Sequence, residues 1–386
     1  MDAGPDVLAA CALSSVPGVG ASTLARIVDR FHSLRQAVDE GPGRLLEQGD
    51  DLRLNTEARQ YLAQGPDLRE LGLLAWEAAR KVGARVLLLG EESYPAQLRR
   101  IVKPPRLLYV RGNLAAQARR VAVVGSRAAD EAGLDLAQTF GDAFARAGVE
   151  VVSGGARGID AAAHVGALWG QGSSIAVLGC GIDVIYPPDN KDLFARLANG
   201  GGAIVSEFPP GSPPAPKNFP RRNRTVAGLS HAVVVVRAAR GSGALITAAE
   251  ARRKGIPVFA VPGNPDNPLS EGPNGLLRDQ QAKLATDPSD VLRELGWPLP
   301  SLPPPIDDAP HPGAAASNGG QGGSDRQALE AKDVELWRLL DERTPAHVDD
   351  LARRAQIPAR EALGRLAELE MKGMVVQRPG KYFLRR

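Results

Sequence analysis

Cysteine is scarce in this sequence: Cys11 and Cys180 are the only two, and no CxxC pair occurs. This usage excludes a disulfide framework and suits a reducing compartment, so we expect a cytoplasmic protein. No apolar run approaches 18 residues, and the first residues, MDAGPDVLAACAL, carry acids where a secretory signal carries a basic flank. A membrane is therefore not predicted as a partner.

Motifs for common cofactors are also missing. The run VAVVGS (121–126) continues into RAADEAG without G-x-G-x-x-G, and no GxxxxGK[ST] occurs. The five histidines are scattered without the spacing of metal ligands. No cofactor and no metal are therefore predicted. The net charge is only +3, so a charged partner can be inferred from local clusters alone.

Composition divides the chain into four segments. Residues 1–82 read as a helical domain, 83–297 as an α/β core, 298–330 as a Pro- and Gly-rich linker, and 331–386 as a small basic domain. In the first segment, Pro17-Gly18-Val19-Gly20 precedes an amphipathic helix, in a pattern that resembles a helix-hairpin-helix or SAM-like module. Such a turn brings backbone amides close to a phosphate, although a plain helical corner needs glycine as well.

The core segment alternates apolar β-branched runs with helical patterns. Strands are predicted at 121–126, 149–155, 173–179, 202–208, 231–238 and 257–263, and helices at 130–147, 157–169, 191–199 and 244–254. Two earlier runs, 85–90 and 106–112, are candidates to extend the sheet. Continuous apolar strands that alternate with helices predict a mostly parallel, Rossmann-like sheet covered on both faces.

Several predicted strands end in loops rich in Gly or Ser. These are GSR (125–127), SGGARGID (153–160), GCGID (179–183) and GSGALIT (241–247). The carboxyl ends of parallel strands share one sheet edge, where small residues and helix N-termini favour a phosphate. Each loop alone is also explained by a tight turn, but together they predict one phosphate-binding edge that includes Arg127 and Arg157. Asp160 is more typical of a first-turn helix residue than of a catalyst.

A cationic stretch, KNFPRRNR (217–224), precedes the predicted strand at 231–238. Residues 208–249 contain no acid, whereas prolines before and within the stretch stiffen it. Phe219 among the cations offers a face on which an unpaired base stacks. A solvated turn is the alternative, but the combination favours single-stranded nucleic acid. This hypothesis requires Arg127, Lys217 and Phe219 to lie on one face of the molecule.

These motifs resemble, in order and spacing over residues 85–295, the DNA-processing protein A family (DprA, also called Smf). The matching segments are GSR, VVSGGARGIDAAAH, AVLGCGIDVIYPPDN, SEFPPG, NFPRRNRTVAGLS and SGALITAAEARRKGIPVFAVPG. The resemblance implies a Rossmann-like core with a SAM-like N-terminal domain and a winged-helix C-terminal domain. It implies a dimeric, non-enzymatic protein that binds single-stranded DNA, protects it and helps to load RecA recombinase during natural transformation.

The resemblance also implies a binding site. Arg127 and Lys217 match the main DNA-contacting cations of the family, and Phe219 matches a base-stacking position. The full predicted nucleic-acid site comprises Gly125, Ser126, Arg127, Ser153, Gly154, Gly155, Arg157, Lys217, Asn218, Phe219, Arg221, Arg222, Asn223, Arg224, Ser242 and Gly243. The chain departs from the family pattern at Arg237, Pro273 and Gln280, where Glu, Thr and Gly are usual; the departures predict a more basic pocket rim.

Two other functions remain open. Nucleoside-monophosphate-cleaving enzymes of the lysine-decarboxylase-like group share a Rossmann-like fold and use a helix Glu, for which Glu250 is the candidate, but their PGG loop is absent. A duplex-binding regulator is the third reading, because residues 359–370 occupy the recognition-helix position of a winged helix. That helix mixes Arg360 and Arg365 with acids, so contact with duplex DNA and contact with protein stay open as alternatives.

Overall fold

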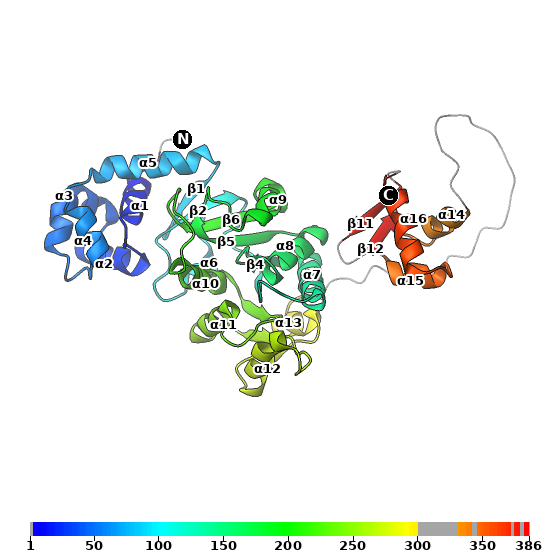
Figure 1. The fold of residues 1–386 in the computed structure, drawn as a ribbon. Helices are drawn as coiled ribbons and strands as arrows, with labels where there is room; N and C mark the ends of the chain where they lie inside the picture. Colours follow the sequence, from blue (N-terminus) through cyan, green and yellow to red (C-terminus); the bar gives the residue numbers. More distant parts are fainter. Residues whose placement is uncertain (1–2, 300–330, 342–345, 372–373, 379–381, 386) are drawn as a thin grey trace, which may run out of the picture. The chain divides into compact units, whose positions relative to one another are not determined.

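The computed structural model describes residues 3–299, 331–341, 346–371, 374–378 and 382–385 (Figure 1). Two compact units are present, Met1–Pro304 and Pro305–Arg386. Most of the predicted linker, residues 300–330, lies outside the described residues. Searching the described ranges for a helix with the length and hydropathy of a membrane span finds none.

A nine-stranded sheet forms the centre of the first unit, in the order β1-β2-β6-β5-β4-β3-β7-β8-β9. The strands are β1 Arg85–Leu88, β2 Leu107–Gly112, β3 Arg120–Val124, β4 Glu150–Ser153, β5 Ser174–Gly181, β6 Gly202–Phe208, β7 Ala232–Val235, β8 Val258–Ala260 and β9 Lys283–Leu284. All pairs from β6 to β9 are parallel, whereas β1 with β2 and β2 with β6 are antiparallel. The predicted mostly parallel sheet is confirmed, and the two early runs extend it.

Helices cover both faces of this sheet, as the continuous apolar strands predicted. On one face, α7 (Glu131–Arg146) and α8 (Ile159–Trp169) pack against alternate residues of β3 and β4. On the other face, α10 (Asn218–Leu229) and α11 (Gly243–Arg253) pack against the intervening residues. Every residue of β3 is buried, because alternate side chains enter two different cores.

The strand order creates a crevice beside β3. The chain runs from β3 outward through β4, β5 and β6, then returns to place β7 on the opposite side of β3. The connections on the two sides therefore diverge at the carboxyl ends of β3 and β7, which is where open α/β sheets bind ligands. The amide of Ser126 donates to the carbonyl of Arg237 across this point, at 2.6 Å.

Five helices precede the sheet: α1 Pro5–Ser15, α2 Ala21–Phe31, α3 Leu34–Glu47, α4 Thr56–Leu62 and α5 Leu68–Lys81. They enclose a core of their own, while α1 and α5 also pack on β2. Gly18 has a φ of +79° in the turn before α2, where a side chain would collide with Asn55. Both cysteines are free and buried.

The remaining helices of the first unit are short. They are α6 Ala96–Arg99, α9 Lys191–Arg196, α12 Glu271–Arg278 and α13 Pro288–Glu294, with single turns at Pro188–Asn190 and Pro268–Ser270. The helix predicted at 191–199 ends at Arg196 and continues as a wider π turn over Leu197–Gly201, where Gly200 leaves the helical region. Helix α10 was not predicted at all.

The second unit has the arrangement of a winged helix. Helices α14 (Ala331–Arg338), α15 (Val348–Arg354) and α16 (Ala359–Met371) pack with a three-stranded antiparallel sheet. Its strands, in the order β10-β12-β11, are Ala346–His347, Tyr382–Arg385 and Val375–Arg378. Their shared core includes Leu351, Leu366 and Phe383. The sequence also predicts a hairpin around Pro379-Gly380, and these two residues lie outside the described residues.

Candidate nucleic-acid interface

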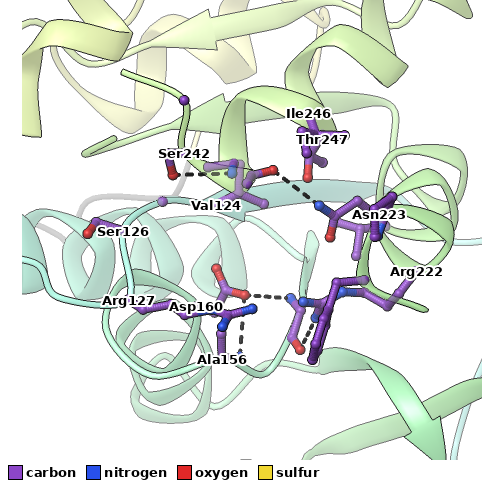
Figure 2. Close-up of a pocket in the computed structure, with 18 of the residues that line it drawn as sticks. Val124, Ser126, Arg127, Ala156, Asp160, Arg222, Asn223, Ser242, Ile246 and Thr247 are labelled. Atoms are coloured by element: carbon purple, nitrogen blue, oxygen red, sulfur yellow. Dashed lines mark hydrogen bonds between the residues drawn. The ribbon is translucent and has the colours of Figure 1, made fainter. Parts of the chain in front are cut away.

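A pocket of about 840 Å³ lies at the carboxyl ends of β3, β4 and β7 and against the first turns of α10 and α11. Figure 2 shows Arg127, Asp160 and Arg222 on one side and Ser242, Ile246 and Thr247 on the other. A second pocket of about 300 Å³ adjoins it, with Arg127, Tyr186 and Phe219 among the residues lining both. The predicted site residues that line one or both pockets are Gly125, Ser126, Arg127, Gly154, Gly155, Arg157, Phe219, Arg222, Asn223, Ser242 and Gly243.

Phe219 stands between the two pockets and is surrounded by cations. The guanidinium carbon of Arg127 lies 5.1 Å from the centre of its ring, and that of Arg222 lies 5.8 Å away. The Tyr186 ring is also adjacent, with 6.0 Å between centroids. Gly179 makes room for the ring, since a Cβ there would lie 2.9 Å from Phe219 Cδ1. The aromatic and cationic surfaces that single strands require are thus combined at one point.

A network of buried charged groups lies next to Phe219 and holds Arg222 in place. Arg222 donates through Nη1 to the carbonyls of Gly154 and Val177, while Asp160 Oδ2 accepts from the amides of Gly154, at 3.1 Å, and Ala156. One peptide segment at Gly154 therefore connects the cation to the carboxylate. Burial raises the pKa of Asp160 and lowers that of Arg222, because desolvation opposes both charges. Asp160 has the expected first-turn position in α8.

A buried histidine lies in the same layer of the structure. Ser174 Oγ donates to the carbonyl of Val151, so its contact of 2.7 Å with His164 requires the ring Nδ1 to donate. The other ring nitrogen of His164, Nε2, is then an unprotonated acceptor, and it has no partner among the described residues. Burial, with a smaller effect from the charge of Arg222, lowers the pKa of His164 to about 3. The imidazole is therefore neutral.

The Gly and Ser loops let the backbone approach the pocket closely. A Cβ at Gly125 would lie 2.7 Å from the carbonyl oxygen of Arg237, so this close passage of two loops requires glycine. The Ser242 hydroxyl caps α11 by accepting from the amide of Ala244, at 3.4 Å. Asn223 Nδ2 donates to the carbonyl of Gly243, at 3.1 Å, and so links α10 to the start of α11.

Lys217, Asn218 and Ser153 lie outside the two pockets. Lys217 is exposed at the N-cap position of α10, and its ammonium is 3.5 Å from Glu57 of the helical region. Asn218 Nδ2 donates to the carbonyl of Gly179, at 3.1 Å. The buried Ser153 hydroxyl donates to the carbonyl of Val123, at 2.6 Å. Arg127 and Phe219 are thus brought together, and Lys217 stands two residues before Phe219 at the start of the same helix.

Two cationic residues of the predicted site, Arg221 and Arg224, lie on a different face of α10 from Phe219 and Arg222. Arg221 Nε donates to the buried Glu207, at 2.8 Å, and Arg224 lies 3.8 Å from the carboxylate of Glu250. Together with Thr225 they line a separate cavity. The stretch KNFPRRNR is therefore divided between two surfaces by the helix that it forms.

Some residues of the pocket wall were not predicted. Tyr186, Arg240 and Ile246 line it and are exposed, and Tyr186 belongs to the segment IYPPDN, whose aromatic residue was the available signal. The prediction that Arg237 makes the rim of the pocket more basic is wrong. Arg237 as a whole is 7% exposed, its guanidinium lies 3.7 Å from Asp130, and it lines neither pocket. Gln280 has a φ of 54°, which accounts for the glycine expected there.

The alternative sites carry less support. Glu250 is 9% exposed and pairs with Arg253 and Lys254 as well as Arg224, and it lines neither pocket. No group of three or more potential metal-ligating side chains occurs among the residues that the structure describes. In the winged helix, Arg365 of α16 lies 2.9 Å from Asp333, so one of its two basic residues is engaged within the unit.

Comparison with known proteins settles the family. The sequence profile of DNA recombination-mediator protein A matches residues 85–296, and that of the DprA winged helix domain matches residues 324–381. The chain belongs to the DNA recombination-mediator protein A family. Within this family it is 44% identical to Protein Smf of Escherichia coli over 293 residues, 75% of each chain. It is 42% identical to the DNA processing protein DprA of Streptococcus pneumoniae over 205 residues, 53% of this chain and 72% of the relative.

Solved structures of family members have the same fold. The X-ray structure of DprA from Streptococcus pneumoniae superimposes with a TM-score of 0.59 at 30% identity, covering 76% of this chain and 99% of that one. DprA from Helicobacter pylori, whose structure describes its single-stranded DNA binding mode, gives a TM-score of 0.50 at 29% identity. That match covers 55% of this chain and 95% of the other. The predicted combination of Rossmann-like core and winged helix is confirmed for this DprA-family chain.

Proposed function

We propose that this DprA-family protein binds single-stranded DNA in the two adjoining pockets at the β3/β7 crevice, and that it acts in DNA processing during transformation. The observation that carries the proposal is the cluster of Arg127, Phe219 and Tyr186. The Arg127 guanidinium lies 5.1 Å from the centre of the Phe219 ring, and the Tyr186 ring centre lies 6.0 Å from it. An unpaired base stacks on the rings, and the guanidinium neutralises a neighbouring phosphate. The single-stranded DNA bound by the Helicobacter pylori relative supports this reading.

Electrostatics at α10 favour the same ligand. Lys217 stands at the helix N-cap, and no acid occupies the first turn of α10. Cations at a helix N-terminus oppose the helix dipole, so a phosphate there relieves two unfavourable interactions together. Arg127, Arg157, Lys217 and Arg240 are exposed around the pockets and α10. Neutralising about four phosphates predicts that log K falls with log salt at a slope near −3.

Fluorescence anisotropy of the full chain with labelled oligo-dT tests the proposal. Arg127→Ala and Lys217→Ala should each weaken binding about tenfold or more and make the salt slope less steep by about 0.7. Phe219→Ala should weaken binding by a comparable factor with little change in slope, because stacking releases no counterion. Arg196→Ala removes an exposed cation on α9 and is the matched control. Unaltered oligo-dT affinity in all three site variants would refute the assignment.

A binding role fits the site better than catalysis. The alternative enzyme would need Glu250 to face a small substrate, but this carboxylate is enclosed by three cations. Incubation with nucleoside monophosphates, followed by assay for released ribose 5-phosphate, checks this alternative. Turnover that is lost in Glu250→Gln would favour the enzyme.

Partners remain proposals drawn from the family resemblance. We propose a homodimer that protects single-stranded DNA in the cytoplasm and loads RecA recombinase onto it. Light scattering tests the dimer, and RecA ATPase on strands covered with single-strand-binding protein tests the loading. Deletion of residues 324–386 separates the roles of the units: single-strand binding should largely survive, whereas duplex binding through the winged helix should be lost.

A further inference from the structure

A separate cavity of about 270 Å³ lies on the opposite side of α10 from the proposed DNA pockets. Its walls come from parts of the first unit that are far apart in sequence. The turn before α2 and the first turn of that helix supply Gly18, Gly20, Ala21, Ser22 and Thr23. The segment before β2 supplies Lys103, and α10 supplies Arg221 and Arg224. The helical region and the α/β core thus build one cavity together.

The cavity is cationic. Lys103, Arg221 and Arg224 line it, against a single acid, Glu207. Glu207 is 4% exposed and already accepts hydrogen bonds from Arg221 Nε and the Thr225 hydroxyl. Only Nε of the Arg221 guanidinium is used in that contact, so the N–H groups of Nη1 and Nη2 remain available as donors. Arg221 Nη1 lies 3.5 Å from the Cβ position of Gly20, which places it beside the start of α2.

The start of α2 contributes neutral donors to the same cavity. Its N-cap residue is Gly20, which provides no side-chain cap, so the first amides of this 11-residue helix have no such partner. Thr23 is 8% exposed and lines the cavity. Its hydroxyl is a further neutral donor that a ligand in the cavity can engage.

We propose that this cavity binds a phosphate of the single strand that leaves the β3/β7 pockets. The assignment rests on the proposed function, because the two sites share α10 as a wall. Phe219, Arg222 and Asn223 face the DNA pockets, whereas Arg221, Arg224 and Thr225 face the cavity. Lys217, at the N-cap of α10 and paired with Glu57 of the helical region, lies at the end of the helix around which a strand would pass.

The double variant Lys103→Gln/Thr23→Val tests the cavity. Lys103 is exposed and Val retains the shape of Thr, so neither change removes a buried charge. Lys81→Gln, an exposed lysine at the end of α5, is the matched control. Oligo-dT of about 6 nucleotides should occupy only the first pockets, and oligo-dT of about 20 nucleotides should reach both sites. The double variant should bind the long strand about fivefold more weakly, with a salt slope reduced by about 0.7, and should bind the short strand normally.

Unchanged affinity for the long strand, or an equal loss for both lengths, would overturn the proposal. Inorganic phosphate distinguishes a strand phosphate from a free anion. If phosphate binding depends on Lys103 and Thr23 while oligo-dT affinity does not, the strand assignment is wrong. Arg127→Ala should weaken both lengths. If Arg127→Ala binds both lengths normally, the assignment of DNA to the β3/β7 pockets is wrong, but the cavity is not affected. If the wild-type protein binds neither strand, both the proposed function and this inference are wrong.

Discussion

The Gly154 position offers a sharp test of how the proposed DNA pocket is held in shape. A Cβ at Gly154 would lie inside 3.0 Å of Arg222 Nη1 and 2.6 Å from Asp160 Oδ2. Gly154→Ala therefore forces one of the two buried charges to move. Arg222 is 5% exposed and is fixed by two carbonyls, so its displacement breaks at least one hydrogen bond to a charged group.

The expected cost follows from those contacts. A hydrogen bond to a charged group contributes about 1.5–3 kcal/mol, and overpacking a close-packed site adds about 1–3 kcal/mol. Gly154→Ala should thus lower the free energy of unfolding by about 3 kcal/mol or more, measured by urea denaturation at an unchanged m value. Because Phe219 rests against Arg222, the affinity for oligo-dT should fall several-fold as well.

Gly275→Ala in α12 is the matched control, since no atom lies within 4 Å of its Cβ position. Alanine is the better helix former there by about 1 kcal/mol at most, so this variant should be neutral or slightly more stable. If Gly154→Ala unfolds at the same urea concentration as Gly275→Ala, Arg222 is free to move. The rigid network below the DNA pocket would then not exist.

Two further predictions concern buried polar groups. The pKa of His164 is lowered from 6.5 to about 3, so the unfolded chain takes up a proton that the folded chain excludes, and stability should fall as the pH drops below 6.5. His164→Asn keeps a donor for Ser174. Between about pH 7 and pH 5 it should make the free energy of unfolding, measured with urea, depend less on pH, by up to about 1.4 kcal/mol per pH unit. An unchanged pH dependence would contradict the buried neutral imidazole. Glu207→Gln removes the charged acceptor of Arg221 and should cost about 1–2 kcal/mol by urea denaturation, whereas Glu57→Gln, which loses an exposed pair with Lys217, should cost less than about 0.5 kcal/mol. Equal losses in these two variants would refute the different roles assigned to the two carboxylates.

The sheet and its loops could be predicted because their physics is local. Continuous apolar runs report burial on both faces, and Gly or Ser after each run reports a tight turn at the sheet edge. These signals alone predict that Gly125, Gly154 and Ser242 lie at one edge of the sheet. The antiparallel pairing of β2 with β6 was not predictable in the same way, because strands β3, β4 and β5 separate the two segments in the sequence.

Helix α10 escaped prediction for an identifiable reason. Its buried residues include Arg222, Asn223 and Thr225, so the apolar period of 3.6 that indicates a helix is absent. Three prolines shortly before it and Pro220 within its first turn also favoured an extended reading, although proline is tolerated in the first turn of a helix. The polar residues are buried because they hydrogen-bond to the loop at Gly154, to strands β5 and β6 and to the start of α11. Local sequence pattern does not encode these tertiary contacts.

That missed helix changes how the cationic stretch acts. In an extended segment, alternate residues such as Lys217, Phe219 and Arg221 would share a face, but on a helix residues three or four apart do so. Phe219 and Arg222 therefore face the DNA pockets, while Arg221, Arg224 and Thr225 face the cavity beside α2. A strand held by both surfaces must bend around the N-terminus of α10, where Lys217 stands. Lys217 should accordingly matter more for long strands than for short ones, in contrast to Arg127.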